Sequence, residues 1–228
     1  MDRRAFLMST LSAAADAPEV RLAVIGTGNR GTGLLRTALR APSVEISAVS
    51  DLSEEAASRA AGIAAEATGR RPRVFAGTES AWRGVLELER IDAVLIATPW
   101  QWHAPMAVES MRAGKYTGVE VPIALTYEEC WQLLETWEKT GTPCMMMENW
   151  SFRRDNLAVL NMIRRGLFGR MVHCHCAHSH DCVDHWFFDR EGRMRWGGEF
   201  LAKRNADQYP THSLGPVLSW LDINCGDA

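Results

Sequence analysis

Gly26-Thr27-Gly28-Asn29-Arg30-Gly31 completes a G-x-G-x-x-G pattern, and its position between two regular elements decides the fold. Ahead of it, residues 20–25 (VRLAVI) form a short apolar run rich in β-branched side chains, which predicts a buried strand. After it, leucines and alanines at helical spacing between residues 34 and 39 predict a helix. A strand, a glycine-rich turn and a helix in this order are typical of a dinucleotide-binding unit.

Each glycine of the pattern has its own physical role. Gly26 allows the tight turn, Gly28 lets the backbone approach a pyrophosphate, and Gly31 lets the helix pack on the strand. The helix N-terminus then stabilises the phosphate charge. A second strand, predicted over residues 44–49, is followed by Asp51, whose carboxylate would accept hydrogen bonds from the adenosine ribose and repel a 2′-phosphate. The sequence therefore predicts NAD as the cofactor, in preference to NADP.

Strand and helix patterns continue to alternate as far as residue 148. Further helices are predicted over residues 54–68, 78–89, a segment ending at 113, and 127–139. Further strands are predicted at residues 74–75, 91–97, 119–121 and 144–147. This alternation predicts an α/β fold, a Rossmann-like, doubly wound parallel sheet. Pro99 would end the strand over residues 91–97 at the carboxyl end of the sheet, where open α/β folds bind their ligands.

The pattern changes after residue 148. Helices are predicted over residues 156–165 and 213–221, a strand over residues 171–179, and an irregular segment over residues 186–196. We therefore expect two domains, an NAD-binding domain over residues 19–148 and a partial α+β substrate domain over residues 149–228.

Composition limits the classes of protein that remain. The chain has 228 residues, 46% of them hydrophobic, with a net charge of −3, which is typical of a globular protein. The slight acidity argues against a nucleic-acid partner, and no apolar run reaches the roughly 20 residues needed to span a bilayer. A twin-arginine export signal is predicted over residues 1–18 from Arg3-Arg4, the apolar stretch after it and Ala15-Asp16-Ala17. We therefore expect an exported protein, or a cytoplasmic one if the signal is inactive.

A cluster of histidines and cysteines over residues 173–185 raises the alternative of a zinc site. On a strand over residues 171–180, alternate members would share one face: Cys174, Cys176, His178 and His180. Structural zinc sites, however, usually draw pairs of ligands from two separated places, and no second pair lies elsewhere. We expect no metal, and a strand that lines a cleft instead. The six cysteines do not indicate a disulfide scaffold, and they leave the redox compartment open.

Several motifs recur in order and at a spacing that resembles one known family. They are Trp100-x-x-His103, Glu120-Val121-Pro122, Met145-Met146-Met147-Glu148-Asn149, Tyr209-Pro210-Thr211-His212 and Leu214-Gly215-Pro216. From about Leu22 to Asp227 the chain resembles glycoside hydrolase family 109, the NAD-dependent α-N-acetylgalactosaminidases of the glucose–fructose oxidoreductase and inositol dehydrogenase (Gfo/Idh/MocA) superfamily. Members of this family extend well beyond this chain's length, so we interpret the sequence as a partial chain or a natural truncation.

The resemblance implies two sets of site residues. The NAD site would comprise the glycine pattern and positions after later strands: Gly26, Gly28, Asn29, Arg30, Gly31, Asp51, Trp100, Gln101, Trp102, His103, Glu120, Val121 and Asn149. The substrate site would comprise His178, Tyr209, Pro210, Thr211 and His212. His212 is the implied catalytic imidazole, because its unperturbed pKa near neutrality suits proton transfer.

The resemblance also implies an unusual hydrolysis of terminal α-N-acetylgalactosamine, outside the common two-carboxylate scheme. NAD⁺ would oxidise the sugar at C3, a base would remove the proton at C2, and the C1 substituent would be eliminated. Water would then add at C1 and the hydride would return, so NAD would not be consumed. The substrate would be a small molecule or a glycan, and a homodimer is the assembly that the superfamily suggests.

Three positions depart from the family pattern. His178 stands where a substrate-contacting tyrosine is expected, and Gly197 stands where an arginine that holds the sugar is expected. Val121 occupies the place of the catalytic lysine of the dehydrogenases, which argues against a plain alcohol dehydrogenase. Two alternatives stay open: a sugar oxidoreductase that turns NAD over, and a non-catalytic module that binds NAD or sugar.

Overall fold

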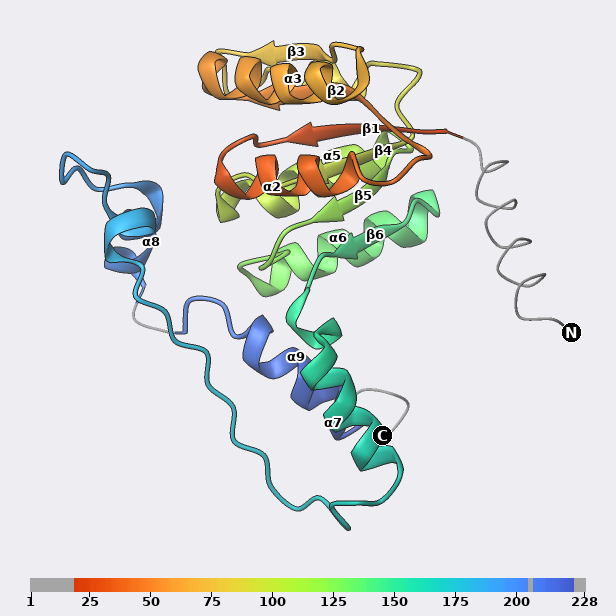
Figure 1. Cartoon of the computed structure of the whole chain (residues 1–228), viewed down its shortest axis with the longest axis vertical. Coiled ribbons are helices and arrows are strands. Elements are labelled where there is room, and N and C mark those ends of the chain that lie inside the picture. The colour runs from red at the N-terminus through yellow and green to blue at the C-terminus, as the bar shows by residue number, and fades with distance from the viewer. Residues whose placement is uncertain (1–18, 205–206, 224–228) are drawn as a thin grey trace, which may run out of the picture. The chain divides into compact units, whose positions relative to one another are not determined.

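The computed structural model describes residues 19–204 and 207–223 (Figure 1). The chain divides into two compact units between Met146 and Met147. The export signal predicted over residues 1–18 lies outside the described residues. In the described ranges, no helix combines the length and the apolar character that crossing a membrane would require.

The first unit is built on a six-stranded sheet whose five strand pairings are all parallel. The strand order is β3-β2-β1-β4-β5-β6, so the order reverses direction between β1 and β4. The strands are β1 (Val20–Ile25), β2 (Val44–Asp51), β3 (Arg73–Ala76), β4 (Ala93–Ile96), β5 (Tyr116–Val119) and β6 (Cys144–Met146). The predicted Rossmann-like sheet is therefore confirmed, and its reversal point marks the place where such folds bind a dinucleotide.

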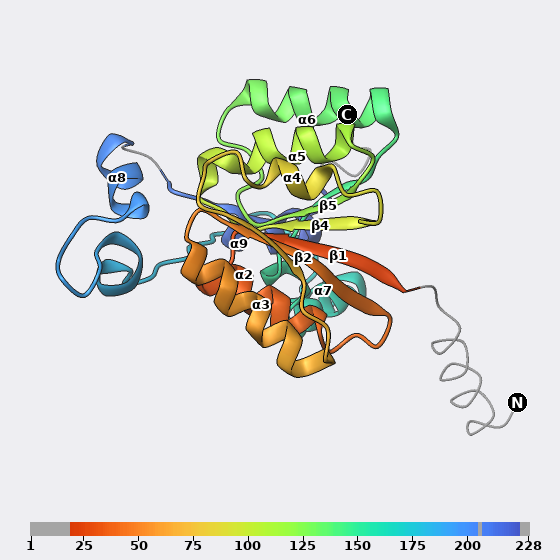
Figure 2. The same ribbon diagram turned by 90° about the horizontal axis from the view of Figure 1, so that it is seen from above.

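Helices cover both faces of this sheet. They are α2 (Asn29–Ala38), α3 (Glu54–Thr68), α4 (Arg83–Leu86), α5 (His103–Arg112) and α6 (Tyr127–Thr140), with a 3-10 turn η1 (Trp100–Trp102) before α5. Figure 2 shows α2 and α3 on one face and α4, α5 and α6 on the other. Each face has its own buried cluster, one including Leu35 and Val49, the other including Val85 and Met111.

The helix boundaries follow from local chemistry. Ser53 accepts a hydrogen bond from the Ala56 backbone N–H, which caps the start of α3. Thr126 and Glu129 form a reciprocal capping box at the start of α6. Both helices end at a glycine in the left-handed region, where a side chain would be strained: Gly69 (φ 73°) and Gly141 (φ 66°).

The helix predicted over residues 78–89 is mostly wrong. Only Arg83–Leu86 is α-helical, and the preceding residues form successive turns. Arg83 N–H, for instance, donates to the Ser80 carbonyl three residues back, and Gly84 N–H donates to the Ala81 carbonyl. Side-chain hydroxyls in this segment favour turns over a regular helix. The apolar side chains of this segment still face the core, since Trp82 and Val85 are buried.

The second unit contains helices and an extended segment. Its elements are η2 (Trp150–Phe152), α7 (Arg154–Arg164), the π-helical turn η3 (Val183–Phe187), α8 (Trp196–Lys203) and α9 (Thr211–Trp220). The strand predicted over residues 171–179 is wrong, because these residues belong to no strand. Among the described residues of this unit, β pairing is limited to the bridge between Phe188 and Met194. An alternating pattern makes a strand only when another strand pairs with its backbone.

Candidate functional site

The turn after β1 is held in a conformation that two of its glycines make accessible. Gly26 has φ +85°, and a Cβ at this position would lie 2.7 Å from the carbonyl carbon of Ala97. A Cβ at Gly31 would overlap the carbonyl oxygen of Gly26. Gly26 thus permits the turn, and Gly31 lets α2 begin directly against it.

Gly28 presents the opposite situation. No atom of the described chain comes within 4 Å of a Cβ built at this position, so the space beside its backbone is open. Gly28 is the N-cap residue of α2. Because it has no side chain to accept a capping hydrogen bond, the backbone N–H groups of the first turn stay available to a ligand. An open face beside a helix N-terminus is the cradle that a pyrophosphate requires.

Asp51 ends β2 and holds the glycine turn in place. Its Oδ2 accepts hydrogen bonds from Thr27 N–H at 2.6 Å and from the Thr27 hydroxyl at 3.1 Å. Its Oδ1 accepts a hydrogen bond from Ser53 N–H at 2.9 Å. A carboxylate has about four acceptor positions, so capacity remains for a ribose hydroxyl. The predicted ribose contact stays a prediction, and the structure adds a second task for the same side chain.

Arg30, in the first turn of α2, is paired with a residue that follows β5. Its Nε donates to Glu120 Oε1, and Glu120 Oε2 accepts a hydrogen bond from Val121 N–H at 3.2 Å. Glu120 is only 7% exposed, so its charge is compensated by Arg30 in a largely buried place. This ion pair ties the glycine turn to Val121 and Pro122, which are joined by a cis peptide bond.

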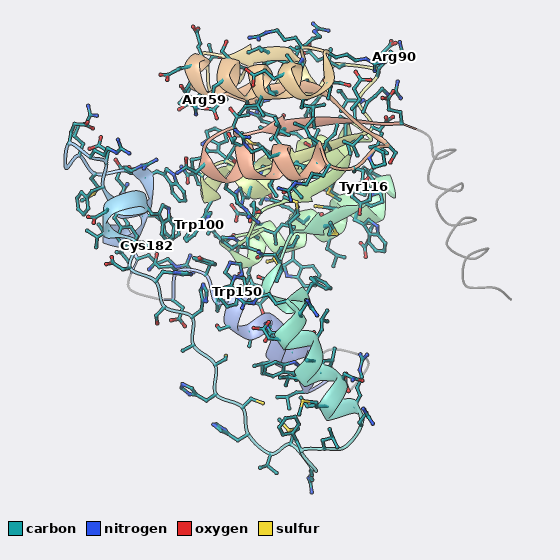
Figure 3. The ribbon with its side chains drawn as sticks, in the orientation of Figure 1. Arg59, Arg90, Trp100, Tyr116, Trp150 and Cys182 are labelled. Atoms are coloured by element: carbon teal, nitrogen blue, oxygen red, sulfur yellow. The ribbon has the colours of Figure 1, made fainter. Side chains whose placement is uncertain are left out.

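The segment after β4 carries four predicted NAD contacts with different exposures. Trp100 is buried, Gln101 is exposed and Trp102 is half-buried; Figure 3 labels Trp100 at the carboxyl end of the strands. His103 is 1% exposed, with Nδ1 2.7 Å from the Pro122 carbonyl oxygen and Nε2 2.8 Å from that of Thr98. Burial lowers the pKa of His103.

This geometry gives His103 a bracing role between two loops. Its ring connects the loop after β4 with the loop after β5, both at the edge where a dinucleotide would lie. A direct contact of His103 with NAD stays a prediction.

In the second unit, His212 pairs with a buried carboxylate. His212 lies at the start of α9, and its Nδ1 is 2.8 Å from Glu148 Oε2 and 3.0 Å from Glu148 Oε1. Their side chains are 12% and 8% exposed. Glu148 Oε1 also accepts a hydrogen bond from Trp150 N–H at 2.5 Å, which fixes the carboxylate. Because Nδ1 carries the proton donated to Glu148, Nε2 is the nitrogen available for exchange.

Aromatic rings surround this pair. Trp150 stacks on His212 with ring centroids 5.6 Å apart, and Tyr209 meets His212 edge-on at 5.2 Å. His178 meets His212 edge-on at 5.0 Å and Trp150 at 4.4 Å. Figure 3 labels Trp150 where the second unit begins. The fold thus brings three predicted substrate residues, His178, Tyr209 and His212, into one cluster.

Two polar atoms in this region are buried without a hydrogen-bond partner, the Nε2 of His178 and the Oγ1 of Thr211. Buried polar atoms are almost always paired, so unpaired ones at a cluster of this kind suit a ligand. Pro210 is exposed just before α9, and Asn149 is exposed just before η2. Asn149 therefore lies in the second unit, and its predicted contact with NAD stays a prediction.

Sequence reasoning missed two residues of the cluster. The motif over residues 145–149 contains Glu148 but implies no role for it, and none of the motifs includes Trp150. The available signal is the position of Glu148 two residues after β6, near the carboxyl end of a parallel strand. Gly215 also lies in a motif that implies no role for it. A Cβ at this position would overlap the Ser151 hydroxyl, so α9 packs closely on η2.

Within the described ranges, no group of three or more histidine, cysteine, aspartate or glutamate side chains is arranged to hold a metal ion. Cys174 and Cys176 are free thiols on the segment for which a strand is predicted, and Cys182 is a free thiol just before η3. His185 has no described side chain, and Cys225 lies outside the described residues.

The glycine turn, the open cradle at Gly28 and the strand reversal define the first unit as a dinucleotide-binding Rossmann domain. Residues 20–148 match the family model of the oxidoreductase family with an NAD-binding Rossmann fold, which confirms NAD as the cofactor. Residues 152–228 match the family model of the glycosyl hydrolase 109 C-terminal domain. The chain belongs to the Gfo/Idh/MocA oxidoreductase family, and its second part is similar to the C-terminal domain of glycosyl hydrolase family 109.

Relatives and a solved structure agree with this assignment. The chain is 42% identical over 214 residues to a glycosyl hydrolase family 109 protein of Shewanella sp. (strain W3-18-1), covering 91% of this chain and 45% of that protein. It is 41% identical over 208 residues to an alpha-N-acetylgalactosaminidase of Shewanella oneidensis, with the same two coverages. The chain thus spans about half the length of the curated relatives it matches.

Among solved structures, an NAD-binding protein from Listeria innocua is similar to this chain with a TM-score of 0.57 and 27% identity. The similarity covers 67% of this chain and 42% of that one.

Proposed function

We propose that the chain is part of an NAD-dependent glycosidase that hydrolyses α-N-acetylgalactosaminides through transient oxidation of the sugar. The observation that carries this proposal is the Glu148–His212 pair, because it supplies an oriented imidazole with one exchangeable nitrogen. The substrate class follows the name of the Shewanella oneidensis relative. The bound NAD would supply a hydride acceptor that returns the hydride later in the cycle.

The chain's own residues would hold this cofactor by separate means. Gly28 leaves room for the pyrophosphate at the N-terminus of α2. Asp51 would accept hydrogen bonds from the ribose hydroxyls while it holds the Thr27 backbone. Glu120 orients Arg30 beside the turn. The observed donors, acceptors and free space therefore fit a dinucleotide.

In the second unit, His212 Nε2 would exchange a proton with the sugar. Glu148 keeps the imidazole in the required tautomer and stabilises it when it becomes positively charged. Trp150 and Tyr209 flank the ring and limit the access of water. Positioned acid–base groups of this kind contribute roughly 10²- to 10⁴-fold to a rate.

Cleavage of an aryl α-N-acetylgalactosaminide in deuterated water tests the proposal. The released sugar should carry deuterium at C2, because deprotonation at C2 precedes elimination. His212→Gln should lower the rate by roughly 10²-fold or more. Ser219→Ala, an exposed change on the same helix, is the matched control and should leave the rate unchanged.

Two results would contradict this reading. Release of the sugar without deuterium at C2 would exclude the elimination route. Accumulation of NADH with a free sugar would assign the chain to the sugar oxidoreductases instead.

A further inference from the structure

Three imidazoles form a row in the second unit. The ring centroids of His212 and His178 are 5.0 Å apart, and those of His178 and His180 are 4.3 Å apart. Both contacts are edge-to-face. Exposure rises along the row, since the His212 side chain is 12% exposed, His178 is half-buried and His180 is exposed. The row therefore leads from the buried Glu148–His212 pair to solvent.

The hydrogen bonds of His212 and His178 leave one nitrogen of each ring available to accept or release a proton. Glu148 occupies Nδ1 of His212, so Nε2 of His212 exchanges the proton. Nε2 of His178 is buried and has no hydrogen-bond partner. A neutral imidazole accepts a proton on one nitrogen and can release one from the other. Because Glu148 holds the His212 ring, the proton route requires the His178 ring to rotate, and the centroid separations of 5.0 and 4.3 Å place both neighbouring rings within its reach.

The charges around His178 favour a neutral ring that carries a proton only in passing. Its pKa is lowered, first by burial and then by the positive charge of His180 and of His212, whereas Glu148 opposes the shift. Tyr209 faces the same ring edge-on at 6.4 Å. A resting positive charge is thus disfavoured in the middle of the row.

We propose that His212, His178 and His180 form a proton relay between the buried Glu148–His212 pair and solvent. The proposal rests on the proposed function, which makes His212 the group that takes a proton from the sugar. The protonated His212 passes that proton from Nε2 to neutral His178. His178 then releases the proton on its other nitrogen to His180, which gives a proton to water. This leaves His178 as its other neutral tautomer, and a flip of its ring restores the starting arrangement before the next turnover.

Titration of the histidine ring signals by nuclear magnetic resonance tests the coupling without requiring activity. In the unchanged chain, His178 should titrate below the ordinary histidine range. His180→Gln should raise the pKa of His178, because one neighbouring positive charge is removed. His173→Gln changes an exposed histidine of the same segment and should leave it unaltered. A pKa of His178 that is equal in all three proteins would overturn the relay.

Kinetics in dilute buffer provide the second readout. His180→Gln should slow sugar cleavage by roughly 10²-fold with KM unchanged, and added imidazole buffer should restore the rate. A His180→Gln protein as fast as the unchanged chain in dilute buffer would overturn the relay. Absence of any cleavage by the unchanged chain would instead contradict the proposed function, and the titration would still decide whether the rings are coupled.

Discussion

Gly28, Gly31 and Gly33 lie within six residues of one another but differ in what surrounds their missing side chains. A Cβ at Gly31 would overlap the Gly26 carbonyl oxygen, whereas Cβ atoms at Gly28 and Gly33 would meet no atom of the described chain within 4 Å. Gly33 is exposed inside α2, away from the turn itself. Substitutions at these three positions can therefore distinguish an effect on packing from an effect on cofactor binding.

Alanine at these three positions should give three different results. Gly31→Ala should lower the free energy of unfolding by about 1–3 kcal/mol, because the turn must shift. Gly28→Ala should keep its stability but lose about tenfold in NAD affinity, because its methyl group occupies the cradle. Gly33→Ala should keep NAD affinity and gain about 0.5–1 kcal/mol of stability. Thermal unfolding and calorimetric titration with NAD measure both quantities, and equal NAD affinity in Gly28→Ala would refute the cradle.

Asp51 combines a structural and a recognition role, so its variants need two readouts. Asp51→Asn keeps an acceptor oxygen for Thr27 but removes the negative charge that would repel a 2′-phosphate. We expect weaker NAD binding and a smaller preference for NAD over NADP. Asp51→Ala should also lower stability, because the Thr27 backbone N–H loses its partner. A ratio of NADP to NAD affinity that stays fixed in Asp51→Asn would count against this account.

At the scale of elements, a salt bridge joins the two central strands of the sheet. Arg21 of β1 donates to Asp92, just before β4, at 2.9 Å from Nε and 2.7 Å from Nη2. Arg21 lowers the pKa of Asp92 to about 2 through these hydrogen bonds. Because the folded pKa lies below the unfolded one, the stabilisation is present above about pH 4 and is lost as pH falls towards 2.

Asp92→Asn should therefore reduce stability at neutral pH by less than about 1 kcal/mol, since the pair is partly exposed. The difference from the unchanged chain should shrink as the pH falls from 4 to 2. Thermal unfolding over that range measures it. A difference that is constant with pH would show that the ion pair does not account for the effect.

The contact between α9 and η2 controls the geometry of the Glu148–His212 pair. A Cβ at Gly215 would overlap the Ser151 hydroxyl and lie 3.5 Å from Cγ of Glu148. Gly215→Ala should therefore force the Ser151 side chain into another rotamer, lower the stability of the second unit by about 1 kcal/mol or less and reduce sugar cleavage. Ser151→Gly in the same chain should restore both, because it removes the overlapping side chain. Failure of the double variant to recover would mean that this contact does not position Glu148.

At the scale of the whole molecule, the sequence predicted what local patterns determine. The glycine turn, the sheet and Asp51 beside the turn follow from residues that are near one another in the chain or at a fixed offset. The Glu148–His212 pair joins residues 64 positions apart, which no local spacing specifies. The expected strand over residues 171–179 failed for the same reason, since a strand depends on a partner elsewhere in the chain.

The first unit would bind the cofactor and the second would transfer the proton, and sugar cleavage requires the cofactor first. Native mass spectrometry of the purified chain, with NAD or NADP added, measures cofactor binding most directly. We expect one NAD per chain, a smaller fraction bound with NADP, and a smaller fraction of the NAD complex in Gly28→Ala. A bare mass at NAD concentrations that saturate other Rossmann domains would contradict the account.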